Sequence, residues 1–234
     1  MMVKYTYLLI DFFTIIIPFI FSFHPKIQFQ KKWASFFPAM AISAILFLVW
    51  DEVFTSWGVW GFNPTYLIGL NIGHLPLEEI LFFVCVPYAC VFTYFCFQKF
   101  GSNKIINERI ALFITIILVG ILLVIGILNF SNDYTASTFI LLAVFLLWHH
   151  FISKSPYLPD FYFSYIILLI PFFMVNGVLT GTGLETQVVW YNDIENLGIR
   201  IGTIPVEDIF YGMLLILLNV TLFESLNKAR TAPQ

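Results

Sequence analysis

The sequence predicts an all-α integral membrane protein, a seven-helix bundle built from two parallel three-helix repeats joined by a linking helix. Three observations support this fold class. The 234 residues are 60% hydrophobic and 11% charged, a composition typical of a chain surrounded by lipid. Seven apolar runs approach or reach the length of a membrane span. One acidic motif occurs twice, beginning at positions 69 and 198.

The seven apolar runs define the expected helices. Crossing about 30 Å of hydrocarbon takes about 20 residues of helix. The fifth run is the shortest, so a longer helix or tilt must make up its length. The first run contains Asp11 and precedes no small-residue cleavage site, so we treat it as a helix and not as a signal peptide. The runs are Tyr5–Phe23, Ala34–Trp50, Leu75–Phe97, Ile110–Phe130, Thr135–Trp148, Phe161–Thr180 and Ile204–Phe223.

Charge predicts the orientation of the chain, because Lys and Arg favour cytoplasmic loops. Most basic residues fall in the first, third and fifth loops and in the C-terminal tail, and only Lys4 and Arg200 fall on the other side. We therefore expect the N-terminus outside, the C-terminus in the cytoplasm and the protein in the cell membrane. The residues on the basic side are Lys26, Lys31, Lys32, Lys99, Lys104, Arg109, Lys154, Lys228 and Arg230.

The repeated motif divides the chain into parts. Residues 69–80 and 198–209 agree at six of twelve positions, and each copy places a proline and two acids directly before an apolar run. The copies begin the third and seventh helices, so both helices enter the membrane in the same direction and the repeat is parallel. We expect a first repeat over residues 1–107, a linking helix over 108–133 and a second repeat over 134–234.

The acids of the motif have two interpretations. In a single copy, the helix dipole would explain acids in the first turn. Two copies on one side of a bundle can instead meet at a buried site, where a carboxylic acid beside a carboxylate performs acid–base catalysis. Successive helical residues point about 100° apart, so one acid of each pair faces inward, and the sequence leaves open which one. The candidates are Glu78, Glu79, Glu207 and Asp208, together with Asp11 inside the first helix.

Aromatic residues surround the predicted site in sequence. Those in the outer loops are either an interfacial belt or a lid over the site. Aromatic faces can also stabilise a carbocation formed by protonating a hydrocarbon. We take Trp57, Trp60, Trp190 and Tyr211 as candidates for substrate binding.

Together these residues resemble a known family, the flavin-independent integral-membrane lycopene cyclases, in its fused two-part form. The resemblance rests on Pro76-Leu-Glu-Glu79 and Pro205-Val-Glu-Asp208. It rests further on Trp50-Asp51, on the Trp-Gly-Val-Trp-Gly stretch of residues 57–61 and on the Tyr5 to Asp11 segment of the first helix.

The resemblance implies lycopene β-cyclase activity, an intramolecular lyase or isomerase reaction of carotenoid biosynthesis. A proton adds to the terminal double bond of lycopene, the neighbouring double bond attacks the cation, and proton loss leaves a β-ionone ring, first in γ-carotene and then in β-carotene. It assigns the four motif acids to catalysis, with Glu207 and either Glu78 or Glu79 as first choices, and Asp11 and Asp51 in support. We expect lycopene and lipid as partners, and neither cofactor, metal nor nucleic acid.

Other seven-helix functions fit less well. A retinal protein needs a Schiff-base lysine in its last helix, but the run Ile204–Phe223 has none. A membrane iron oxygenase needs converging histidines, whereas the chain's four are divided between both faces. A prenyltransferase would need Asp-rich magnesium motifs, which are missing. The alternative that stays open is a non-catalytic membrane protein that binds a carotenoid or resembles the retinal proteins.

Overall fold

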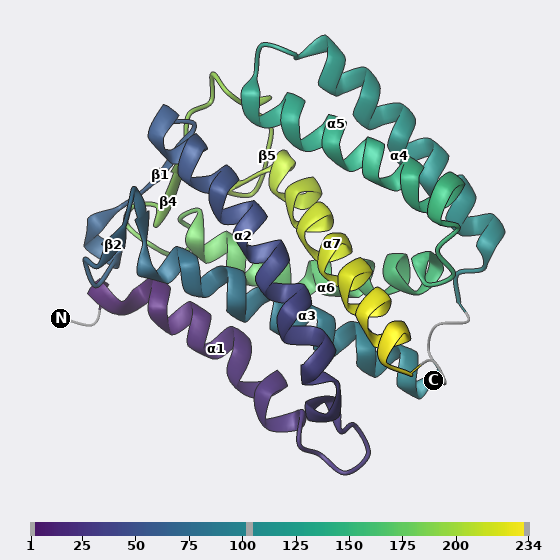
Figure 1. Cartoon of the computed structure of the whole chain (residues 1–234). Coiled ribbons are helices and arrows are strands. Elements are labelled where there is room, and N and C mark those ends of the chain that lie inside the picture. Colours follow the sequence, from purple (N-terminus) through teal and green to yellow (C-terminus); the bar gives the residue numbers. More distant parts are fainter. Residues whose placement is uncertain (1–2, 102–104, 232–234) are drawn as a thin grey trace.

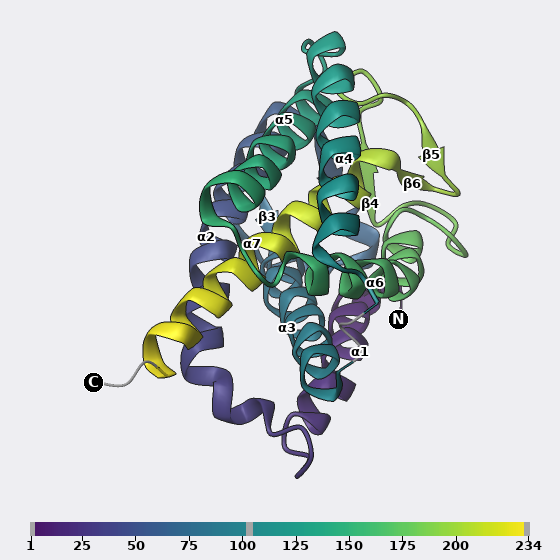
Figure 2. The same cartoon turned by 90° about the vertical axis from the view of Figure 1, so that its right-hand side faces the viewer.

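Seven helices form the protein in a computed structural model, which describes residues 3–101 and 105–231. Within these residues, all seven helical segments are long and apolar enough to cross a membrane, which confirms the predicted all-α membrane fold and the helix count. Figure 1 and Figure 2 show the bundle from two directions, with the termini on opposite sides. Lys104, one of the basic loop residues, lies outside the described residues. The helices are α1 Thr6–Phe21, α2 Trp33–Trp57, α3 Leu77–Phe100, α4 Glu108–Leu128, α5 Asp133–Leu147, α6 Leu158–Leu179 and α7 Val206–Thr231.

The second helix is longer than its apolar run predicts. It continues to Trp57. Asp51 is therefore helical, whereas the predicted run ended one residue before it. The added turns bury Asp51 and Phe54, which gives this segment a reason to stay helical. Gly58 ends the helix in the left-handed conformation, with a φ of 75°.

The fifth helix reaches membrane length by extension. A π-helical segment, Trp148–Ser153, continues α5 directly. His149 in this segment is fully buried, and its two ring nitrogens lie 2.8 Å from the hydroxyls of Ser155 and Thr221. These contacts satisfy the imidazole inside the bundle. A longer helix therefore makes up the length that the fifth apolar run lacked.

A short hairpin precedes each acidic helix. Strands β2 (Asn71–Ile72) and β3 (Leu75–Pro76) lead into α3, and β5 (Arg200–Ile201) and β6 (Ile204–Pro205) lead into α7. Each hairpin turn begins with a glycine at positive φ, a conformation that favours glycine. Each proline ends a strand one residue before its helix, so it lies outside the helix although the predicted apolar run included it.

A third strand pair joins the loop before the first hairpin to the loop before the second. Strand β1 (Trp60–Phe62) pairs antiparallel with β4 (Val189–Tyr191), and Trp60 lies opposite Tyr191. A Cβ atom on Gly61 would lie 2.4 Å from the Trp190 ring, so a larger residue there would require the indole to move. The outer segments before α3 and α7 are therefore tied together over the bundle.

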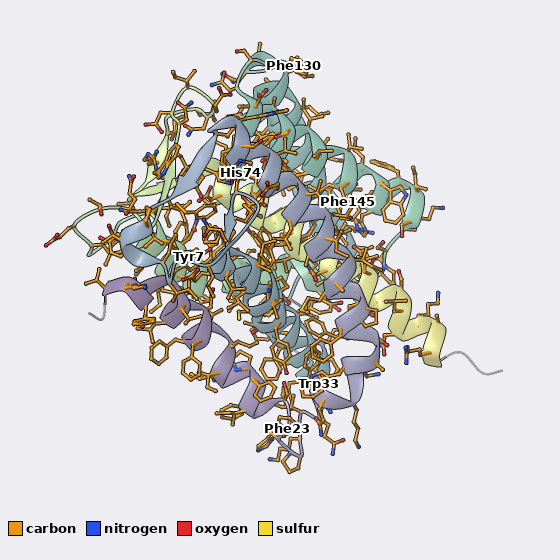
Figure 3. The ribbon with its side chains drawn as sticks, turned by 60° about the vertical axis from the view of Figure 1, so that its left-hand side comes forward. Tyr7, Phe23, Trp33, His74, Phe130 and Phe145 are labelled. Carbon is orange, nitrogen blue, oxygen red and sulfur yellow. The ribbon has the colours of Figure 1, made fainter. Side chains whose placement is uncertain are left out.

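The helices pack around α7. Helices α2 and α5 pack against α7, α1 packs along α3, and α4 lies beside α5 at one edge, as Figure 1 shows. Phe23 and Trp33 meet at the turn from α1 to α2, with ring centroids 5.4 Å apart, and Figure 3 labels both. Large apolar side chains such as Phe113 and Ile170 are more than 60% exposed, as expected of helices that face lipid.

Candidate active site

The two acidic helices begin in the same way. Leu77 N–H donates to the carbonyl of Leu70 at 2.8 Å, and Val206 N–H donates to that of Ile199 at 3.0 Å. Each hairpin is thereby held against the first residue of its helix. The acids that follow occupy the first turn, where the helix dipole stabilises negative charge. All four are at most 8% exposed: Glu78, Glu79, Glu207 and Asp208.

The first acid of each pair braces the loop before its hairpin. Glu78 Oε1 accepts a hydrogen bond from the backbone N–H of Ile68 at 2.6 Å. Glu207 Oε1 accepts one from that of Leu197 at 2.8 Å and another from the Thr135 hydroxyl at 2.7 Å. The two carboxylates hold equivalent backbone positions, each ten residues earlier in the chain.

The second acid of each pair faces tyrosines. Glu79 Oε2 accepts a hydrogen bond from the Tyr7 hydroxyl at 2.5 Å. Asp208 accepts from the Tyr134 hydroxyl at 2.6 Å, from Asn176 Nδ2 at 2.7 Å and from the Tyr191 hydroxyl at 3.0 Å. The two environments are therefore chemically unequal.

Asp51 brings a third carboxyl group to this place. It is 2% exposed, and its Oδ1 accepts a hydrogen bond from Trp60 Nε1 at 2.5 Å. Its carboxyl group lies close enough to that of Glu79 for the two to interact electrostatically. Tyr211 interacts electrostatically with Asp51, Glu79 and Asp208. Acids from α2, α3 and α7 thus surround one volume.

That volume is one end of a cavity of about 760 Å³. The three carboxyl groups of Asp51, Glu79 and Asp208 line it, and apolar side chains dominate the rest of its wall. No Lys, Arg or His contributes to this wall in the part of the chain that the structure describes. Without a nearby cation, ionising all three acids at once would be costly in a site removed from water. A proton shared among them avoids that cost.

Aromatic rings enclose the acidic end. The Trp60 ring centroid lies 5.1 Å from that of Tyr134 and 6.1 Å from that of Tyr211. Tyr134 and Tyr191 stack at 5.9 Å. Burial and the nearby charge of Asp208 raise the pKa of Tyr191 well above its ordinary value. Its phenol therefore stays neutral and can donate to the aspartate.

The structure divides the candidates predicted from sequence. Trp60 and Tyr211 line the cavity beside Glu79 and Asp208. Glu78, Glu207 and Asp11 are buried outside that lining, and Trp57 and Trp190 are 66% and 40% exposed. Neither oxygen of Asp11 has a hydrogen-bond partner among the described residues; the group interacts electrostatically with Glu78.

Sequence reasoning missed three polar residues that hold the second acids, namely Tyr7, Tyr134 and Asn176. A signal for two of them exists. Each tyrosine lies four residues before a polar residue inside an apolar run, Tyr7 before Asp11 and Tyr134 before Thr138. Figure 3 shows Tyr7 near the beginning of α1. The sequence carries no comparable signal for Asn176, which lies in the last turn of an apolar helix.

No metal centre is suggested by the acids. Within the described residues, no group of three or more His, Cys, Asp or Glu side chains is arranged to hold a metal ion. The available chemistry is proton transfer between carboxyl groups at the aromatic end of an apolar cavity. The fold and the site together define an integral membrane protein with a cavity suited to an apolar molecule.

Comparison with known proteins identifies the family. The lycopene cyclase family model matches residues 4–97 and 131–226. The chain therefore belongs to the lycopene cyclase family, whose activity is carotenoid cyclisation and whose substrate is a carotenoid in a lipid environment. No curated protein and no solved structure matches the chain.

Proposed function

We propose that the protein is a lycopene β-cyclase that forms β-ionone rings by proton transfer, without net oxidation. The observation that supports this proposal most strongly is the position of Glu79, Asp51 and Asp208. They stand at the aromatic end of a cavity that is otherwise apolar. The cavity suits a hydrocarbon, and the acids can supply and remove the one proton that the reaction needs.

Glu79 is the proton donor in this mechanism. It shares its site with the carboxyl group of Asp51, and a carboxylic acid paired with a carboxylate keeps a transferable proton. The proton adds to the terminal double bond of the carotenoid and leaves a tertiary carbocation. The next double bond attacks that cation, closes the six-membered ring and moves the positive charge onto a ring carbon.

Asp208 is the proton acceptor. The hydrogen bonds from Tyr134, Asn176 and Tyr191 stabilise its carboxylate form. Loss of a ring proton to this carboxylate forms the ring double bond and restores charge balance, so one proton enters the substrate and one leaves. The rings of Trp60 and Tyr211 present π faces to the cations between these steps.

The first acids of the motifs position the second ones. Glu78 and Glu207 bind the backbone of the preceding loops, and this geometry favours a bracing role over proton transfer. Trp190 supports the site through its contact with Gly61. Asp11 has no hydrogen-bond partner within the described part of the chain and interacts with Glu78 as a like charge, so we keep it only as a supporting acid.

Expression in a lycopene-accumulating bacterium tests the function. We expect β-carotene, with γ-carotene as the intermediate, when the pigments are separated and identified. An E79Q/D208N double variant that is present in the membrane in equal amount should leave lycopene unchanged. Unchanged lycopene with the wild-type protein would contradict the proposal. Retention of lycopene by that inactive wild-type protein would instead support a non-catalytic carotenoid-binding protein.

The orientation and the division of the chain follow from the same proposal. We place the protein in the cell membrane with the N-terminus outside, so that the acidic helix starts lie near the outer face. The repeats extend over residues 1–107 and 134–234, and residues 108–133 link them. Reporter fusions at Lys4 and at Arg230, scored for activity outside and inside the cell, test the orientation.

A further inference from the structure

The cavity continues far beyond the acids. On α3 its wall consists of residues that recur on one helix face from Glu79 to Thr93. These fourteen steps at about 1.5 Å each correspond to a length of about 21 Å. On α1 the wall follows one face from Thr6 to Pro18 in the same way. The cavity is therefore a groove that runs from the acidic end toward the opposite face of the membrane.

The deep part of the groove is apolar even where its residues are not. The hydroxyl of Thr14 donates to the carbonyl of Ile10, and that of Thr93 donates to the carbonyl of Ala89, both at 2.8 Å. Each hydroxyl is thus satisfied by its own helix. The surface that these residues present to the groove is therefore apolar, and it favours a hydrocarbon chain.

The groove opens sideways. Phe13 and Ile17 on α1 and Met174 on α6 all line it, and they are 66%, 62% and 70% exposed. Helix α1 packs along α3 and touches α6 at few places. The opening therefore lies between α1 and α6, at the level of the membrane where the surrounding solvent is lipid.

We propose that a linear carotenoid enters the groove from the bilayer between α1 and α6 and that the groove holds only part of it. The reacting end reaches the acids, the adjoining part lies along α3, and the distal end stays in the lipid. This inference rests on the proposed function for the identity of the occupant. A linear C40 polyene is about as long as the hydrocarbon core is thick, about 30 Å, which exceeds the groove.

A groove shorter than its substrate has a consequence for specificity. The protein recognises the end group and the chain beside it, whereas the distal end touches no part of the groove. A carotenoid that already carries one ring can therefore bind with its open end inward. The second ring then requires the molecule to leave and to bind again in the reverse direction.

Ala89 is the position that tests the groove. It lies ten residues after Glu79, about 15 Å along the helix, and its small side chain lines the wall. Ala89→Phe narrows the groove there without touching the acids. Val144→Phe is the matched control, since Val144 is 55% exposed on α5 and lies outside the lining.

The measurement is the affinity of the protein in nanodiscs for each probe. Saturable quenching of tryptophan fluorescence reports the binding. The probes are lycopene and an acyclic C15 polyene with the same end group, which is short enough to end before Ala89. We expect A89F to bind lycopene at least tenfold more weakly than the wild type and to bind the C15 polyene equally well. V144F should bind both like the wild type.

Two results would overturn the inference. One is lycopene binding by A89F with wild-type affinity, which would mean that the chain does not lie in the groove or that an acyl chain of the lipid occupies it. The other is an equal loss of both probes, which would mean that the change acts at the acidic end. Wild-type protein that binds lycopene in this way but forms no ring would contradict the proposed function and leave the groove intact.

Discussion

The beginnings of α3 and α7 have the same backbone arrangement, but the surroundings of their second acids differ. In both, the first acid binds the backbone ten residues earlier, at Ile68 for Glu78 and at Leu197 for Glu207. The second acids differ. Glu79 meets another carboxyl group, whereas Asp208 meets neutral hydrogen-bond donors. The same backbone arrangement can thus hold an acid at one helix and a base at the other. The neighbours of each carboxyl group decide whether its protonated or its ionised form is stable.

The largest effects should come from removing the second acids. We expect Glu79→Gln and Asp208→Asn each to lower ring formation by about 10² to 10⁴-fold, the usual contribution of a general acid or base. Initial rates with lycopene in membranes measure this effect. Glu185→Gln, a change to an exposed outer-loop acid, should match the wild type. Normal activity in either site variant would remove that residue from proton transfer.

Changes to the first acids should be milder and should separate bracing from chemistry. Glu78→Gln and Glu207→Gln keep an oxygen that accepts the backbone hydrogen bond, so we expect less than about tenfold loss of rate with a modest loss of thermal stability. Alanine at either position removes the brace and should cost more stability than glutamine. If Glu207→Gln were as inactive as Glu79→Gln, Glu207 would be the acid.

The tyrosines test the inequality of the two halves. Tyr7→Phe removes a hydrogen bond that holds Glu79, whereas Tyr134→Phe leaves Asp208 with Asn176 and Tyr191. We expect the larger loss, up to about tenfold, from Tyr7→Phe, since one hydrogen bond between neutral groups is worth about 0.5–1.5 kcal/mol. Equal losses would indicate that the two sites depend on their tyrosines in the same way.

The smallest effects should come from two partly exposed ion pairs that hairpin residues make with acids outside the hairpins. His74 Nδ1 lies 2.7 Å from Glu52, and Arg200 lies 2.6 Å from Asp193. Exposed pairs contribute little to stability, so we expect Glu52→Gln and Arg200→Gln to keep rates within about twofold of the wild type. A loss of more than tenfold would show that hairpin position, and not only the acids, controls the reaction.

The sequence predicted the seven helices because lipid imposes one simple requirement, a long apolar run. It also identified the acids, since charge before such a run needs a reason. It could not show which acid faced the cavity, because that depends on the hairpins that aim each helix. The strands were not predicted, since two- and three-residue strands have too few residues to show a periodicity. Asn176 became recognisable only when packing brought α6 beside α7.

The position of Asp51 was not predicted either, because it lies in the part of α2 that extends beyond the apolar run. The run ended at Trp50, where hydrophobicity stops but helix formation does not. Burial of Asp51 beside Trp60 depends on a strand pair made with a loop more than 120 residues away. Local pattern cannot report a contact of that kind.

The packing of α2 on α7 and of α3 on α6 has a consequence for how the chain assembles. These contacts, with the β1–β4 pair, join elements from opposite sides of the connection between α3 and α4. That connection keeps both parts at a high effective concentration, because their association is intramolecular. A chain cut there would exchange this first-order assembly for a second-order one, and its ring-forming activity would depend on how densely the two pieces populate the membrane.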